Sequence, residues 1–146
     1  MTKITLGGMP VETIGSLPPV GSTAPDFLLT RQDLSDVTLA NFKGKKKIVN
    51  IVPSLDTGVC AASARRFDHD VAALKDTVLL TVSCDLPFAM ERFCKAEGLD
   101  TIISLSQLRD RKFGTDWGVT MTTGPLAGLL SRAVVVLDEN NTVIYT

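Results

Sequence analysis

The order of apolar runs in the middle of the chain constrains its fold more than any other feature. Residues 48–52 and 78–82 are almost continuously apolar, as expected of central strands covered on both faces. Between them, apolar side chains recur every three or four residues over 58–74, and this spacing predicts a helix. A second helix is predicted over 87–97, with a proline in its first turn and a glycine after its end. Strand and helix therefore alternate, which predicts a βαβ unit.

The segments on either side of this unit are predicted to be β-structure. Residues 133–137 and 142–145 flank a polar turn and predict a hairpin. Near the start, residues 4–6 alternate apolar with polar side chains, and residues 11–14 can pair with them. The whole order predicts a thioredoxin-like three-layer α/β sandwich, a single domain over 1–146 with an N-terminal β-hairpin extension. Shorter elements are expected as strands at 26–30, 37–39 and 102–105 and as a helix at 108–117.

Charge and composition exclude several classes of function. The 146 residues carry a formal net charge of -1, so the chain offers no broad basic surface for nucleic acid. Its one basic run, Lys45-Lys46-Lys47, leads into a predicted strand and is expected to form a solvated edge. No apolar stretch reaches the roughly 18 residues of a membrane span, and the first residues lack the apolar core of a signal peptide. A cytoplasmic location is therefore expected.

Cys60 occupies an unusual place for a structural cysteine. It follows the strand at 48–52 within the stretch PSLDTGVC, behind Pro53 and Thr57. Thr57 is a good helix N-cap, which would place Cys60 in the first helical turn, beside unpaired backbone N–H groups and the positive end of the helix dipole. Both features favour the thiolate and lower the pKa of a cysteine. A packing cysteine is the alternative, because Cys60 also falls on the apolar stripe of its helix.

The motif Pro53-x-x-x-Thr57-x-x-Cys60 matches the peroxidatic-cysteine motif of peroxiredoxins. Four longer stretches resemble the bacterial thiol peroxidase subfamily, an atypical two-cysteine peroxiredoxin: ITLGGMPVETIG, NIVPSLDTGVCAAS, SCDLPFAMERFCKAEGL and GPLAGLLSRAVVVLDEN. The resemblance covers essentially the entire chain. It implies the reduction of hydroperoxides through a cysteine thiolate, with no metal, haem or flavin cofactor. It also implies a homodimer and thioredoxin as the usual reductant.

The resemblance assigns roles to residues around this cysteine. Cys60 would be the peroxidatic nucleophile, which attacks the O–O bond and becomes a sulfenic acid. Thr57 would hydrogen-bond the sulfur and the peroxide, and Pro53 would screen the pocket from water. Arg132, just before the strand at 133–137, would stabilise the thiolate and the charge on the leaving oxygen. A solvated arginine at a strand edge is the alternative interpretation of Arg132.

Cys94 lies on the second predicted helix, in a segment that resembles the resolving-cysteine segment of thiol peroxidases. The resemblance implies that Cys94 traps the sulfenic acid as a Cys60–Cys94 disulfide. Leu86, Met90 and Phe93 form the predicted apolar stripe of the helix, and Cys94 lies at its border, where a thiol can become accessible. We expect the two cysteines to be apart in the reduced protein and oxidation to unwind part of both segments. A half-buried packing cysteine is the alternative.

The sequence gives weaker evidence for a functional role of the other candidate residues. Cys84 follows the strand at 78–82 and is expected to be a small buried side chain. His69, about 13 Å along the helix from Cys60, is expected to be a solvated surface residue, which disfavours a Cys-His hydrolase. Three cysteines and this one histidine lack the spacing of a zinc site. Ser63 stands where a thioredoxin-like disulfide oxidoreductase carries its second cysteine, which disfavours that class.

Some points stay open at the level of sequence. A thioredoxin-fold redox sensor or binding module that signals through the same disulfide is an alternative to a peroxidase. The apolar residues between 114 and 131 could line a pocket for alkyl or lipid hydroperoxides, or they could belong to the core. The resemblance also leads us to expect a final C-terminal helix, which is missing after Thr146.

Overall fold

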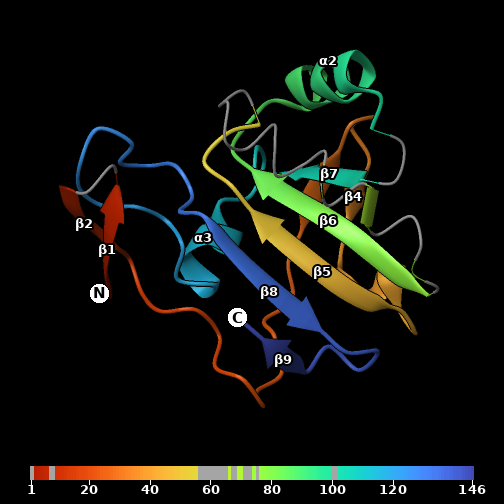
Figure 1. Ribbon diagram of the computed structural model, residues 1–146, viewed down its shortest axis with the longest axis horizontal. Helices are drawn as coiled ribbons and strands as arrows, with labels where there is room; N and C mark the ends of the chain where they lie inside the picture. Colours follow the sequence, from red (N-terminus) through yellow and green to blue (C-terminus); the bar gives the residue numbers. More distant parts are fainter. Residues whose placement is uncertain are drawn as a thin grey trace.

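The computed structural model of the protein describes residues 2–6, 9–55, 66, 69–70, 74, 76–99 and 102–146. Among these residues, a seven-stranded sheet has the order β4-β3-β7-β6-β5-β8-β9 (Figure 1). Its strands are β3 (Leu29–Arg31), β4 (Asp36–Val37), β5 (Lys46–Ile51), β6 (Thr77–Ser83), β7 (Ile102–Ser106), β8 (Ala133–Leu137) and β9 (Val143–Tyr145). A separate two-stranded sheet contains β1 (Thr2–Leu6) and β2 (Met9–Thr13).

The centre of the large sheet consists of parallel strands. β5 pairs in parallel with β6, and β6 pairs in parallel with β7, whereas β8 pairs antiparallel with both β5 and β9. Figure 1 shows the arrowheads of β5 and β6 at the same edge of the sheet. The segments that leave these strands therefore become neighbours, at the edge where open α/β sheets place their ligand sites. The predicted strands at 48–52, 78–82 and 102–105 and the C-terminal hairpin are confirmed.

Two helices lie on opposite faces of the sheet. On one face, α2 (Pro87–Glu97) places Cys94 against Leu79 and Ile102. On the other face, Leu80 of β6 belongs to the main core, together with Phe113 of α3 (Lys112–Asp116). Neighbouring residues of β6 thus point to different layers, as the alternation of a strand requires. The layers confirm the predicted α/β sandwich, and no helix among the described residues has the length and apolarity needed to cross a membrane.

Most of the helix predicted over 58–74 lies outside the described residues. Arg66, His69 and Asp70 are helical, and His69 is exposed, as predicted. The second predicted helix is confirmed at both ends, since α2 begins at Pro87 and ends before Gly98, which has a φ of 64°.

An aromatic cluster forms the centre of the main core. The rings of Phe113 and Trp117 stack with centroids 4.9 Å apart, and Phe27 meets Phe113 edge-on at 5.9 Å. The indole Nε1 of Trp117 donates a hydrogen bond to the carbonyl oxygen of Pro25 at 3.1 Å, so its polar atom is satisfied. Trp117, Met121 and Leu130 are all buried. These apolar residues of the 114–131 segment are therefore core residues.

Several predicted short elements are shorter than expected because side chains capture backbone donors. The helix predicted from residue 108 begins at Lys112, whose backbone N–H donates to Oδ1 of Asp110 at 3.0 Å. The backbone N–H of Leu108 likewise donates to Oγ of Ser106 at 3.1 Å. Such local bonds compete with helical ones. The strands predicted at 26–30 and 37–39 shrink to β3 and β4, and η1 (Leu39–Phe42) is a 3-10 turn.

The basic run at the start of β5 is not a solvated edge throughout. Lys45 and Lys46 are exposed, but Lys47 is fully buried, and its Nζ donates to Oδ1 of Asn141 at 2.5 Å. Lys47 shares a strand face with Val49, so alternation along β5 directs its side chain inward. Burial lowers the pKa of Lys47, and the acidic residues of the β8–β9 turn oppose that shift.

The N-terminal hairpin is confirmed, and its second strand continues into a pairing with a distant loop. The backbone N–H of Ile14 donates to the carbonyl of Thr120, and that of Thr122 donates to the carbonyl of Glu12, both at 2.8 Å. Figure 1 shows β1 and β2 beside this loop, away from the large sheet. The hairpin therefore holds the segment that leads toward β8.

We expect Gly118→Ala to destabilise the protein much more than Gly98→Ala. The φ angles are 67° at Gly118 and 64° at Gly98, so both substitutions carry the strain of left-handed backbone. A Cβ at Gly118 would also collide with the backbone of Ser16, whereas a Cβ at Gly98 meets nothing within 4 Å. In urea unfolding, Gly98→Ala should lower the free energy of unfolding by about 1 kcal/mol and Gly118→Ala by about 3 kcal/mol or more. Equal losses would contradict this close approach of the two chain segments.

Candidate active site at the carboxyl ends of the parallel strands

Residues from separate elements meet at the edge where β5 and β6 end. Pro53 follows β5 and is buried, and Asp85 follows β6. Arg132 reaches the same edge, because its neighbour Ala133 pairs with Ile51 at the end of β5. The structure thus brings Pro53 and Arg132, two of the predicted site residues, to one end of the sheet, with the Arg132 side chain exposed.

Cys60 and Thr57 lie outside the described residues, as does Ser63. The predicted cap and the predicted first-turn position of Cys60 therefore stay predictions. The described part of the site consists of Pro53, Cys94 and Arg132 and the residues that contact them.

Cys94 is more buried than the sequence pattern predicts. Its exposed fraction is 7%, whereas Leu86, predicted to lie on the apolar stripe, is 52% exposed. The reason is that Leu86 is the N-cap of α2 and lies outside the helix, so the buried face runs through Pro87, Met90 and Cys94. The prediction that Cys94 lies at the border of the stripe is therefore wrong. Its thiol is free.

Two polar side chains contact the sulfur of Cys94. Nε2 of Gln32, from the turn between β3 and β4, lies 3.4 Å from Sγ and donates to it. Oγ of Ser104, on β7, lies 3.5 Å from Sγ. Leu79 and Ile102 belong to the same apolar cluster as Cys94. The buried sulfur thus has polar partners from two parts of the chain as well as apolar neighbours.

A buried polar row extends from Cys94 across the sheet. Ser104 pairs with Thr81, and Thr81 pairs with Asn50, so the three side chains lie side by side on β7, β6 and β5. All three are buried, and within the described part of the chain Nδ2 of Asn50 and Oγ1 of Thr81 have no hydrogen-bond partner. An unsatisfied buried polar group costs about 1–3 kcal/mol.

Asp85 is a site residue that the sequence did not single out. Its carboxylate accepts hydrogen bonds from Oγ of Ser54 at 2.7 Å, from the backbone N–H of Leu55 at 2.8 Å and from Oγ of Ser83 at 2.8 Å. Ser54 and Leu55 belong to the motif that leads to Cys60. The only sequence signal was an aspartate placed two residues after a buried strand.

Cys84 has the properties of a structural thiol. It is half-buried, and Nε2 of Gln107 donates to its sulfur at 3.0 Å. Burial raises the pKa of the Cys84 thiol, although the hydrogen bond from Gln107 opposes the shift. A raised pKa keeps the thiol protonated and less nucleophilic.

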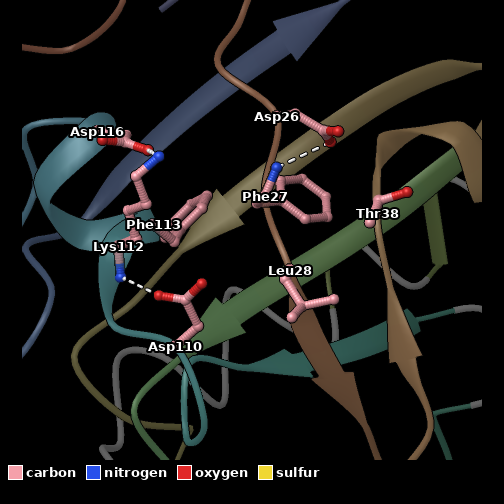
Figure 2. Close-up of a pocket in the computed structure, with 8 residues that line it drawn as sticks. All are labelled: Asp26, Phe27, Leu28, Thr38, Asp110, Lys112, Phe113 and Asp116. Carbon is pink, nitrogen blue, oxygen red and sulfur yellow. Dashed lines mark hydrogen bonds and ion pairs between the residues drawn. The ribbon is translucent and has the colours of Figure 1, made fainter.

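A separate pocket of about 260 Å³ lies between α3 and the segment that precedes β3 (Figure 2). Its charged groups already have partners: Oδ1 of Asp26 accepts from two backbone N–H groups, and Nζ of Lys112 pairs with Asp116 at 3.4 Å. Its floor contains Phe27 and Phe113. None of the predicted site residues lines this pocket. Among the described residues, no group of three His, Cys, Asp or Glu side chains could hold a metal ion.

Comparison with protein families and sequences gives an independent indication of function. Residues 19–146 match the family model described as Redoxin. Over 146 residues the chain is 51% identical to a thiol peroxidase from Mycobacterium bovis, in a match that covers 100% of this chain and 87% of that protein.

Solved structures agree with this result. A peroxiredoxin-like protein from Aquifex aeolicus superposes with a TM-score of 0.92 at 33% identity, over 98% of this chain and 83% of that chain. A thiol peroxidase from Chromobacterium violaceum superposes with a TM-score of 0.88 at 28% identity, again over 98% of this chain and 83% of that chain. The similarity therefore includes the strand edge described above.

Proposed function

Since this chain belongs to the Redoxin family and, within it, to the thiol peroxidases, we propose that it reduces hydrogen peroxide and organic hydroperoxides through a thiolate at Cys60. The observation that carries the proposal is the position of the Pro53 segment at the carboxyl ends of the parallel strands, with Arg132 at the same edge. Such an edge presents a nucleophile on the segment that follows β5. The substrates would be hydrogen peroxide and alkyl or lipid hydroperoxides.

The first step is an attack of the Cys60 thiolate on the terminal oxygen of the peroxide. A sulfur–oxygen bond forms, the O–O bond breaks, and the alkoxide or hydroxide that leaves takes up a proton from solvent. The cysteine is oxidised to a sulfenic acid and the peroxide is reduced to an alcohol or water. Arg132 supplies a permanent positive charge for the thiolate and the leaving oxygen, Thr57 supplies a hydroxyl, and Pro53 excludes water.

The second step forms the Cys60–Cys94 disulfide. The Cys94 sulfur attacks the sulfenic sulfur, a sulfur–sulfur bond forms, and the hydroxyl leaves with the thiol proton as water. Because Cys94 is buried against Gln32 and Ser104, its segment has to leave this site before the bond can form. Partial unwinding of α2 near Cys94 is the expected movement. Reduced and disulfide forms that superpose through this segment would contradict it.

A dithiol protein of the thioredoxin type would then reduce the disulfide and become oxidised itself. A cytoplasmic location suits this cycle, since a reducing compartment supplies such reductants. The working enzyme would be a homodimer, and it would need no metal or organic cofactor.

A redox sensor is the alternative function, because it would use the same disulfide. Steady-state consumption of peroxide with thioredoxin, thioredoxin reductase and NADPH separates the two. A peroxidase turns over rapidly, whereas a sensor turns over slowly. Rapid sustained turnover is the expected result, and slow turnover would favour the sensor.

We expect Gln32→Ala to make Cys94 more accessible in the reduced protein. The substitution removes the amide that donates to Sγ of Cys94. One hydrogen bond of about 1 kcal/mol corresponds to about fivefold in the opening equilibrium. Alkylation of Cys94, followed by peptide mass spectrometry, should therefore be about fivefold faster. Ser35→Ala is a matched control, because it removes a hydrogen bond to Asp33 in the same turn without touching Cys94. The same alkylation rate in both variants would contradict a role for Gln32 in holding Cys94.

A further inference from the structure

The carboxylate of Asp85 joins two parts of the site. Oδ1 accepts from Oγ of Ser54, and Oδ2 accepts from the backbone N–H of Leu55 and from Oγ of Ser83. Ser54 and Leu55 lie on the segment that follows β5, whereas Ser83 is the last residue of β6. The three bonds are 2.7–2.8 Å long, within the ordinary range of protein hydrogen bonds.

Asp85 is itself fixed by the frame of the sheet. Its backbone carbonyl accepts a hydrogen bond from Oγ of Ser106 at 2.6 Å, and Ser106 is the last residue of β7. Its backbone N–H donates to Oγ of Ser83 at 3.2 Å. These two bonds hold the backbone of Asp85 against the ends of β6 and β7, and the segment that its carboxylate binds is linked to them through it.

The same segment contacts the helix that carries Cys94. Leu55 is 2% exposed and packs with Val52 and Met90, and Phe93 contacts this cluster as well as the cluster that contains Cys94. Asp85 also lies two residues before the first residue of α2. The hydrogen bonds of Asp85 thus lie where the segment that leads to Cys60 meets the helix that carries Cys94.

We propose that Asp85 is the positioning residue that holds the segment leading to Cys60 in its peroxide-reactive conformation. Release of the hydrogen bonds from Ser54 and Leu55 precedes formation of the Cys60–Cys94 disulfide. This role rests on the proposed function of the two cysteines. It predicts opposite effects on the two chemical steps: loss of Asp85 slows the oxidation of Cys60, which needs the held segment, and speeds disulfide formation, which needs the released one.

The test compares Asp85→Asn with the wild-type protein, because asparagine keeps the shape but replaces one acceptor oxygen by a donor group. Rapid-mixing measurements should show at least a tenfold fall in the rate constant for Cys60 oxidation and at least a threefold rise in that for disulfide formation. Hydrogen exchange at the Leu55 amide should be at least tenfold faster, with exchange in β6 unchanged. A residue that only supports the fold would lower both rate constants together.

Asp138→Asn is the matched control. Oδ1 of Asp138 also accepts from backbone N–H groups, those of Asn140 and Thr142, but in the β8–β9 turn. It should leave both rate constants unchanged. Ser54→Ala provides a milder variant if Asp85→Asn folds poorly, and it should shift both rates in the same directions by smaller factors.

Unchanged exchange at Leu55 in Asp85→Asn, or a fall in both rate constants, would overturn the role of Asp85. A wild-type protein whose Cys60 is not oxidised by peroxide would instead overturn the proposed function. In that case, exchange at Leu55 would still show whether Asp85 holds the segment, so the two failures are distinguishable.

Discussion

Replacing Cys60 by serine is expected to abolish peroxide reduction. Serine keeps the size of the side chain but has no thiolate, and its hydroxyl is a far weaker nucleophile toward an O–O bond. We expect the rate of peroxide consumption to fall by about four orders of magnitude or more. The measurement is steady-state turnover with thioredoxin, thioredoxin reductase and NADPH.

Cys84→Ser is the matched control for this prediction. Cys84 is half-buried, its pKa is raised by burial, and it lies outside the proposed cycle. The Cys84→Ser variant should retain the turnover of the wild-type protein. If Cys60→Ser remained active and Cys84→Ser did not, the assignment of the nucleophile would be wrong.

In the Cys94→Ser variant, peroxide should still oxidise Cys60, but thioredoxin should no longer recycle the enzyme. Its Cys60 should reduce one equivalent of peroxide at a rate close to that of the wild-type protein, because Cys94 takes no part in that attack. Without a resolving thiol, the sulfenic acid persists and is open to further oxidation to the sulfinic acid. Turnover with thioredoxin should fall at least about a hundredfold.

Two measurements separate these effects in Cys94→Ser. Stopped-flow mixing with peroxide gives the first step, and intact-mass analysis after excess peroxide shows whether sulfinic acid accumulates. Full turnover with thioredoxin in this variant would mean that Cys94 is a packing residue and that another thiol resolves the sulfenic acid.

The sequence was sufficient for most of the sheet. The strands at 48–52 and 78–82 are buried on both faces, so their composition carries the signal without help from distant residues. The ends of α2 were predictable because Pro87 and Gly98 act locally, through a fixed φ and a left-handed φ. Both the buried strands and the ends of α2 were predictable because residues within each element determine them.

The sequence-based predictions were wrong where tertiary contacts determine whether a side chain is buried. Lys47 is buried because its strand face points to the core and Asn141, distant in sequence, accepts its hydrogen bond. Cys94 is buried because the buried face of α2 runs through Pro87, Met90 and Cys94, and the N-cap Leu86 is exposed instead. Apolar spacing alone does not set the phase of a helix whose N-cap is an exposed leucine outside the helix.

In the candidate site, too, residues identified by local sequence were predictable and residues joined by tertiary contacts were not. Pro53 and Arg132 could be predicted, because a motif and a family resemblance identified them, and the topology then brings them to one edge. Gln32 could not be predicted as a partner of Cys94, since the two residues are 62 positions apart and join only through the packing of α2 on the sheet. Asp85 contacts Ser54, 31 positions away in sequence, through the parallel pairing of β5 and β6.

The central claim is that Cys60 and Cys94 form one peroxide-driven redox pair. The most direct measurement treats the fully reduced protein with one equivalent of peroxide, blocks the remaining thiols, and maps the disulfide by peptide mass spectrometry. We predict a single disulfide that joins the peptides containing Cys60 and Cys94, with Cys84 alkylated. A disulfide that includes Cys84, or a protein that remains fully alkylated, would contradict the claim.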